Sequence, residues 1–150
     1  MNKITTPKGA TSGSGQIATL RIELAFTDPA IWREVEVPTA ITLKALHDIV
    51  QAAMGWTDCH LWEMRIGEQA YGLDLDDMWC DLPSQSATKV RLSDLLARGE
   101  TRIDYTYDFG DSWEHSLTFS DLRSGEPDTS YPHLIAGEGY PSGEGRGVKR

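Results

Sequence analysis

The sequence predicts an α+β domain: a mostly antiparallel mixed sheet with one main helix and one short helix on one face, in the order ββαββαββ. Two observations support this prediction. Residues 17–26 and 31–38 alternate apolar and polar side chains, as half-buried strands do. Residues 42–55 then change to the 3.6-residue period of a helix. Because an opening hairpin leads into a helix, a ubiquitin-like topology is one candidate.

The first two strands follow from their alternation. Leu20, Ile22, Leu24 and Phe26 should share one face of the first strand. An Asp-Pro pair then predicts a turn. In the second strand, Arg33, Val35 and Val37 fall on one side.

The main helix should begin after Thr42 as N-cap and end before Gly55. Its apolar stripe consists of Leu43, Leu46, Ile49, Val50, Ala53 and Met54. Residues 60–67 and, more weakly, 70–75 resemble strands, and the acidic residues 74–89 resemble a loop. Residues 91–99 predict a short helix with Ser93 as cap and Gly99 as its end.

The domain boundaries follow from composition. The Gly, Ser, Thr and Lys residues of 1–16 predict a flexible arm, and the Gly-rich residues 137–150 predict a disordered tail. Residues 17–136 form the single domain that a chain of 150 residues suits.

The charge balance limits the partners. The chain has 14 Lys and Arg residues against 23 Asp and Glu residues, a net charge of −9, which disfavours direct binding to nucleic acid. No apolar run approaches the roughly 18 to 20 residues of a membrane span, so we expect no membrane association. Two cysteines without an export signal indicate free thiols in the cytoplasm.

The stretch YTYDFGDSWEHSL, residues 105–117, predicts a hairpin around a Gly110-Asp111-Ser112 loop, with Gly110 supplying unusual backbone angles. The predicted register pairs Phe109 with Trp113, Tyr107 with His115, Tyr105 with Leu117 and Ile103 with Phe119. That face is apolar or aromatic except for His115, and a slip of one residue would mix the two faces. The candidate functional residues are Tyr105, Tyr107, Asp108, Phe109, Gly110, Asp111, Trp113, Glu114 and His115.

This register places Asp108 opposite Glu114, with Asp111 nearby, and opposed like charges are destabilising. A basic side chain, a carboxyl with a raised pKa, or a divalent cation bound to all three carboxylates would relieve the repulsion. The simpler interpretation, which we favour, is a solvated pair with Asp111 capping the turn. No other cofactor is predicted.

Other catalytic or metal-binding interpretations would need residues that this sequence does not show. Asp108-Phe109-Gly110 matches a kinase metal-binding loop, but the other kinase motifs are absent. His115 could be a general base beside Glu114, although a lone histidine on an apolar face is more often a satisfied core residue. Cys59, His60 and Cys80 offer three ligands where structural zinc usually requires four.

The same hairpin motif resembles the signature of the plasmid pRiA4b ORF-three-like family, which includes mobile-element passenger proteins of TnpR type. The segments IWREVEVP, TLKALHDIVQAAMGWTDCHLWEM, RLSDLL and YPHLIAGEGYP also match. The resemblance runs from about Ile17 to Pro141 and implies an α+β fold. The resolvase-type label implies an activated serine and a basic DNA-binding region, and this acidic chain shows neither.

These observations predict a non-enzymatic protein-interaction or accessory module of a plasmid or mobile element, with an unidentified protein partner. Its sheet edge or exposed tryptophans would make the contact. The alternative is a divalent-metal-dependent hydrolase or nuclease that uses Asp108, Asp111 and Glu114.

Overall fold

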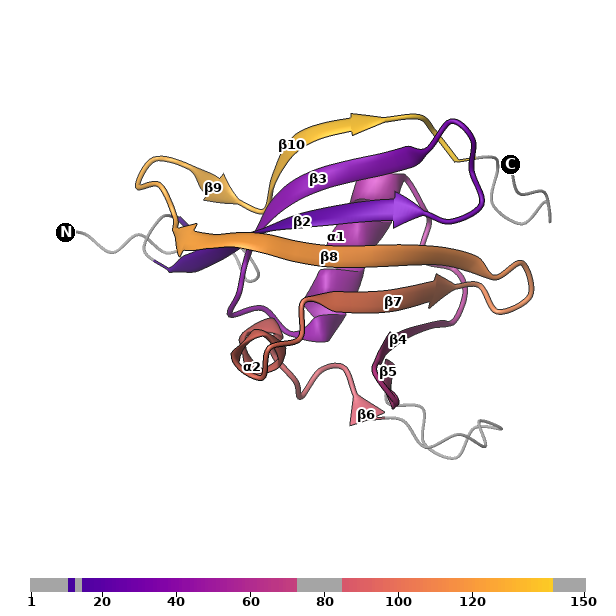
Figure 1. Cartoon of the computed structure of the whole chain (residues 1–150), viewed down its shortest axis with the longest axis horizontal. Helices are drawn as coiled ribbons and strands as arrows, with labels where there is room; N and C mark the ends of the chain where they lie inside the picture. Colours follow the sequence, from indigo (N-terminus) through magenta and orange to yellow (C-terminus); the bar gives the residue numbers. More distant parts are fainter. Residues whose placement is uncertain (1–10, 13–14, 73–84, 142–150) are drawn as a thin grey trace.

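The structure, a computed structural model, describes residues 11–12, 15–72 and 85–141. The elements are β1 (Thr11–Ser12), β2 (Gln16–Leu24), β3 (Ile31–Pro38), α1 (Leu43–Met54), β4 (Trp62–Ile66), β5 (Gln69–Gly72), β6 (Gln85–Ser86), α2 (Leu92–Ala97), β7 (Arg102–Tyr107), β8 (Trp113–Ser124), β9 (Ser130–Tyr131) and β10 (His133–Glu138). Figure 1 shows them along the chain.

One large sheet organises the domain. Its eight strands lie in the order β10-β3-β2-β8-β7-β4-β5-β6, and β1 pairs separately with β9. Every pairing is antiparallel except that of β5 with β6. The mostly antiparallel α+β class is therefore confirmed. The exact order ββαββαββ is not confirmed, because it lacks β1, β6, β9 and β10, and the sheet does not establish a ubiquitin-like topology.

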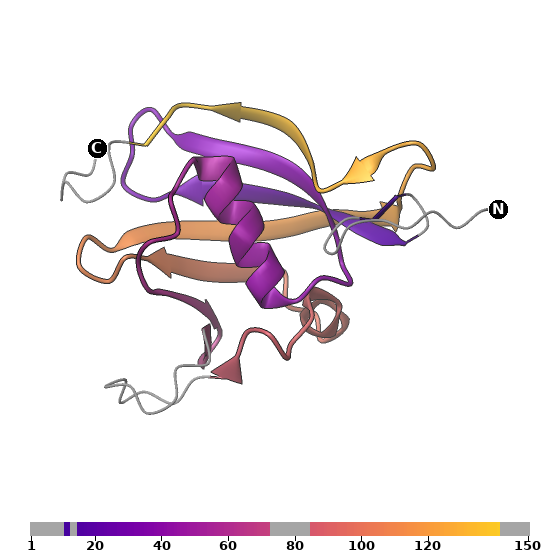
Figure 2. The same cartoon turned by 180° about the vertical axis from the view of Figure 1, so that it is seen from behind.

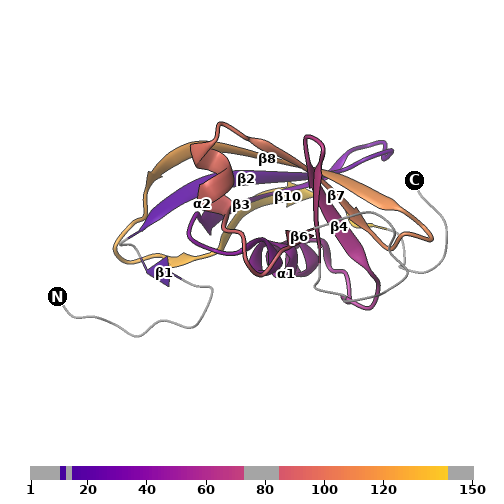
Figure 3. The same ribbon diagram turned by 90° about the horizontal axis from the view of Figure 1, so that it is seen from below.

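Helix α1 lies across one face of the sheet, as Figures 2 and 3 show. The core forms between them, because α1 buries Leu43, Leu46, Val50 and Met54 against the apolar faces of the strands. Helix α2 lies beside the start of α1, where Leu43 N donates to Val90 O and Leu92 N donates to Ile41 O. The other face of the sheet carries no helix within the described residues.

The local signals for α1 are confirmed. The Thr42 side chain accepts a hydrogen bond from Ala45 N at 3.1 Å, and Gly55 takes the left-handed conformation that ends a helix. For α2 the predicted cap is wrong: Arg91 is the N-cap, and Ser93 lies inside the first turn. The Asp94 carboxylate accepts from Arg91 N, which closes this helix start instead.

The end of the first strand also differs from the prediction. Strand β2 ends at Leu24, and Phe26 is exposed with φ of 63° rather than buried on the strand's apolar face. Thr27 causes the change, because its hydroxyl donates to Leu24 O and accepts from Ile31 N. These two bonds close the β2–β3 turn around the phenylalanine.

Strands of the structure lie beyond both predicted domain boundaries. Thr11–Ser12 and Gln16 belong to strands although they fall in the predicted arm 1–16. At the other end, Gly137 and Glu138 belong to β10 although they fall in the predicted tail 137–150. Residues 1–10, 13–14 and 142–150 lie outside the described part.

Arg33 attaches β10 to the rest of the domain. Its buried guanidinium donates to four carbonyls: Ala53 O at the end of α1, Trp32 O, Glu138 O and Gly139 O. A Cβ on Gly137 would lie 2.7 Å from Arg33 Cδ and 2.9 Å from Trp32 O, so a glycine is required at this contact. The predicted orientation of Arg33 toward the apolar side is thereby confirmed and explained.

The helices of the described residues are too short or too polar to cross a bilayer.

Candidate functional site

The β7–β8 hairpin has the predicted faces and a different register. Tyr107 pairs with Trp113, Tyr105 with His115 and Ile103 with Leu117, each two residues from the predicted partner. Because side chains alternate with period two, a shift of two leaves the same residues on each face. Tyr105, Tyr107, Trp113 and His115 are therefore buried toward α1, as the pattern indicates, although their partners were predicted incorrectly.

The loop is longer than predicted and uses other residues to turn. Asp108 and Ser112 take left-handed backbone angles, with φ of 68° and 57°, whereas Gly110 does not. The Asp108 carboxylate accepts from Gly110 N at 3.1 Å and from Asp111 N at 3.4 Å. The turn-closing role predicted for Asp111 thus falls to Asp108. Phe109 lies at the exposed tip instead of facing Trp113.

The opposed carboxylates that motivated the metal hypothesis are not present. Glu114 lies opposite Thr106, and Asp108 lies outside the strand pairing. Asp108 is buried, with His60 Nε2 at 3.6 Å from its second carboxylate oxygen. The reason given for a cation at Asp108, Asp111 and Glu114 is therefore wrong, and the site itself stays a prediction.

His115 is a satisfied core residue, as the simpler interpretation predicted. Trp56 Nε1–H donates to its Nε2 at 3.1 Å, and its Nδ1–H donates to Tyr105 O at 3.2 Å. Burial lowers the pKa of His115 from 6.5 to about 4, although hydrogen bonds to the backbone oppose the shift. The ring is therefore neutral at physiological pH.

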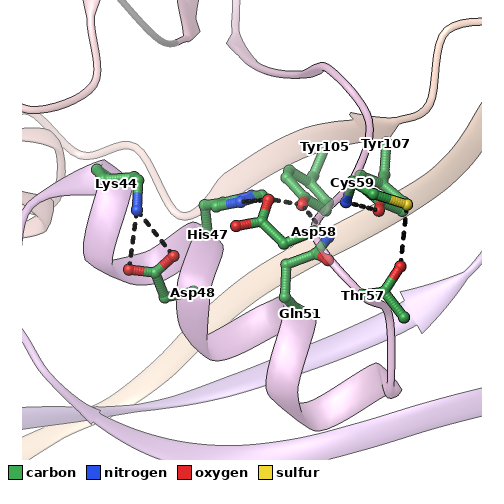
Figure 4. Close-up of polar contacts among 9 residues, drawn as sticks. All are labelled: Lys44, His47, Asp48, Gln51, Thr57, Asp58, Cys59, Tyr105 and Tyr107. Atoms are coloured by element: carbon green, nitrogen blue, oxygen red, sulfur yellow. Dashed lines mark hydrogen bonds and ion pairs between the residues drawn. The ribbon is translucent and has the colours of Figure 1, made fainter.

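A polar network crosses from α1 to β7 beneath the aromatic face (Figure 4). His47 Nε2–H donates to Asp58 Oδ1 at 2.8 Å, since the carboxylate can only accept. The neutral Nδ1 then accepts from the Tyr105 hydroxyl at 2.7 Å, and that oxygen accepts from Gln51 Nε2 at 2.9 Å. Trp62 stacks on the His47 ring, with centroids 4.0 Å apart. The network holds the helix to the sheet.

Burial controls the protonation of this network. It lowers the pKa of His47, an effect that the hydrogen bond to Asp58 partly offsets, and it raises the pKa of Tyr105. Both rings are consequently neutral in the folded protein near neutral pH.

The order carboxylate, imidazole, hydroxyl resembles that of a nucleophilic triad. A triad must present its hydroxyl to a substrate, whereas Tyr105 is completely buried. The arrangement is therefore suited to linking α1 and β7 and not to attacking a bound molecule.

Sequence reasoning missed His47 and Gln51. Both lie on the buried face of α1, one turn apart and next to the apolar stripe. A polar pair at this spacing on an apolar helix face was the available signal. Its partners could not be identified, because Tyr105 lies 58 residues from His47 along the chain.

Among the described residues, His47, Asp48 and Asp58 are the histidine and acidic side chains whose ligand atoms converge within 4.8 Å. A nitrogen and two carboxylates could hold a divalent cation. In this structure the same side chains have other partners: Lys44 Nζ pairs with Asp48 at 2.9 Å, and Asp58 accepts from His47. The zinc set of Cys59, His60 and Cys80 stays a prediction, since Cys80 lies outside the described residues.

Replacing Tyr105 by phenylalanine should lower the free energy of unfolding by about 2 kcal/mol, because His47 Nδ1 and Gln51 Nε2 would lose their buried partner. Urea denaturation measures this loss. Tyr140→Phe deletes the same atom from an exposed ring and should change the stability by less than about 0.5 kcal/mol. Equal effects of the two substitutions would contradict the role assigned to the network.

This chain is similar to a known protein family and to a curated relative. Residues 16–148 match the family described as plasmid pRiA4b ORF-3-like protein. A relative from Sinorhizobium fredii (strain NBRC 101917 / NGR234), described as uncharacterized protein y4hQ, is 41% identical over 101 residues, covering 67% of this chain and 52% of the relative. This chain thus spans about half the length of that curated relative.

The fold recurs in a solved structure. The crystal structure of a protein of unknown function, MM3350 from Methanosarcina mazei Go1, matches with a TM-score of 0.76 and 31% sequence identity, over 83% of this chain and 70% of that chain. The matched range includes the hairpin, α1 and the Arg33 contact. The chain belongs to the plasmid pRiA4b ORF-3-like family.

Proposed function

We propose that this protein is a non-enzymatic interaction module that binds an extended segment of a partner protein along β10. The proposal includes an accessory role on a plasmid or mobile element, which the family's name supports. It also places the protein in the cytoplasm, where an exposed cysteine such as Cys59 stays reduced.

The observation that carries the proposal is the exposed apolar edge of the sheet. Strand β10 ends the strand order, and no described strand pairs with its outer side. Leu134 and Ile135 on this strand are 58% and 46% exposed. Sheet edges of this kind accept an added strand from a partner, whose backbone completes the pairing.

A groove lies behind the same strand. It has a volume of about 450 Å³ and separates α1 from β10. Its lining is mainly apolar: Val35, Ala45, Ile49, Ala52, Ala53, Pro132 and Leu134, with Asp48 as the one charged member. Alternate side chains of an added strand would point toward this groove, which would select apolar residues at every second position.

The predicted contact through exposed tryptophans receives less support. Trp56, Trp62 and Trp113 are buried. Trp32 is half-buried, and the Arg21 guanidinium covers it at 4.3 Å from the ring centroid. The tryptophans of the described chain therefore stabilise the domain, and the contact surface falls on β10.

Selection of binders from a displayed library of random peptides tests the proposal. We expect enriched peptides with alternating apolar residues, and we expect Leu134→Asp and Ile135→Asp each to weaken their binding at least about tenfold, equal to about 1.4 kcal/mol. Both side chains are exposed, so the fold should survive, and circular dichroism checks this.

The matched control is Leu122→Asp, which introduces the same charge at an exposed leucine on β8. It should leave the affinity of the selected peptides unchanged. Peptides that bind the β10 variants as tightly as the unaltered protein would place the contact elsewhere and refute the proposal.

A further inference from the structure

Several loops gather at the end of the sheet where β2 and β7 finish, on the right of Figure 1. The loop rim, as we define it, comprises residues 25–30, 55–61, 108–112 and 139–141. Backbone hydrogen bonds hold these loops to their neighbours: Asp108 N donates to Leu61 O at 2.8 Å, and Ala25 N donates to Glu114 O at 2.7 Å. A hollow of about 450 Å³ lined by residues of 27–31 and 138–140 joins the first loop to the last.

The loop rim concentrates exposed apolar side chains. Phe26, Phe109 and Tyr140 are 71%, 51% and 87% exposed, and Leu61 is also exposed. These are four of the seven large hydrophobic residues that are exposed in the described part of the chain. Exposed aromatic side chains grouped on one surface are typical of an interaction site.

The rim also concentrates unfavourable backbone conformations. Of the five described non-glycine residues with positive φ, four lie here: Phe26, Asp58, Asp108 and Ser112. Aspartate tolerates this region, whereas a bulky aromatic residue does so rarely. At position 26, with φ of 63°, glycine would suit the turn better. Backbone strain of this kind clusters at functional sites.

The charges of the rim define what it can bind. Its loops carry four carboxylates, Asp28, Asp58, Asp108 and Asp111, and contain no lysine or arginine. Asp28 and Asp58 are exposed and Asp111 is half-buried. An aromatic face attracts a cation through its quadrupole, and a neighbouring carboxylate adds charge attraction and a hydrogen-bond acceptor. Phosphate groups would be repelled by the same carboxylates.

We propose that the loop rim is a second binding surface, separate from β10, which takes an arginine-containing basic segment of a partner protein. The guanidinium groups stack on Phe26 or Phe109, since the Arg33 guanidinium already lies 5.7 Å from the centroid of the Tyr140 ring, and the carboxylates of Asp28 and Asp111 pair with them. Arginine fits better than lysine, because its planar group both stacks on a ring and donates to carboxylates.

The test uses a short fluorescent peptide of alternating arginine and serine, and fluorescence anisotropy at physiological salt. We expect saturable binding, and we expect the peptide with citrulline in place of arginine not to bind. The double variant Phe26→Gly/Phe109→Ser should weaken the affinity about tenfold, which corresponds to about 1.4 kcal/mol. Its melting temperature should not fall, since glycine suits the backbone at position 26.

Two controls distinguish binding at the loop rim from a general attraction of the basic peptide to an acidic protein. Leu122→Ser removes an exposed apolar side chain elsewhere and should leave the affinity unchanged. Asp28→Asn/Asp111→Asn should weaken binding more than Glu100→Gln/Glu126→Gln, which removes the same charge from exposed positions outside the rim.

The proposal is overturned if the arginine peptide does not bind, if the two charge variants lose affinity equally, or if single-stranded DNA binds at the rim more tightly than the peptide. Ile135→Asp should not affect the peptide, so failure of the β10 proposal and failure of this one give different results.

Discussion

Replacing Arg33 by methionine should lower the free energy of unfolding by about 3 kcal/mol and release the end of β10. The guanidinium donates to four carbonyls, and those of Glu138 and Gly139 lie at the end of β10 and directly after it. Methionine keeps much of the volume but supplies no donor, so these carbonyls would lose their partners. Urea denaturation measures the global loss, and amide hydrogen exchange measures the local loss along β10.

Arg102→Met is the matched control, because Arg102 is exposed and pairs with the exposed Asp104. Surface pairs of this kind contribute between about 0 and 1 kcal/mol. Arg33→Lys should give an intermediate loss, since an ammonium group cannot reach all four carbonyls. If Arg33→Met costs no more than Arg102→Met, the attachment of β10 does not depend on this side chain.

Acidification should destabilise the protein by about 3 kcal/mol through His115 alone, between pH 6.5 and pH 4. The folded state depresses the pKa of His115 to about 4, whereas an unfolded histidine titrates near 6.5. Above pH 6.5 neither state binds the proton, and the stability that His115 contributes is fully present. As the pH falls from 6.5, His115 is protonated first in the unfolded state, which lowers the free energy of unfolding. This loss of stability is complete near pH 4, where the folded state also binds the proton.

The pH dependence of urea denaturation tests this when the protein is compared with His115→Gln. Glutamine retains an acceptor for Trp56 Nε1 and does not titrate, so the difference in unfolding free energy between the two proteins should shrink as the pH falls. His133→Gln, at an exposed position on β10, should keep the full slope. Parallel pH profiles for the protein and His115→Gln would show that His115 is not held neutral.

The losses of stability expected for Arg33 and His115 concern different parts of the same domain. Arg33 joins β10 to the helix, His47 accepts from the Tyr105 hydroxyl of β7, and His115 on β8 accepts from Trp56 Nε1 in the segment after α1. These residues stabilise the scaffold, while the exposed residues of β10 and of the loop rim remain available for binding. Substitutions of the exposed side chains of β10 and the loop rim should therefore weaken binding without lowering the free energy of unfolding.

Local patterns in the sequence determined the faces of the strands and the limits of α1. Thr42, Gly55 and the alternation in β2, β3 and β4 act within a few residues, so each could be recognised without its neighbours. The burial of Tyr105, Tyr107, Trp113 and His115 on one side followed from the same alternation. The prediction that the hairpin is not catalytic depended on catalytic residues that the sequence lacks, and it stays a prediction.

Only the tertiary structure decided the register of the hairpin, the pairing of β10 and the partners of His47. A shift of two residues preserves the faces, so hydrophobicity cannot distinguish the two registers, and Asp108 in a left-handed conformation selects one. Gly137 and Glu138 at the end of β10 resemble a tail in the sequence, and only the fold shows that Arg33, more than a hundred residues earlier, donates hydrogen bonds to the carbonyls of Glu138 and Gly139. Contacts over such separations depend on how the whole chain packs, which no local pattern encodes.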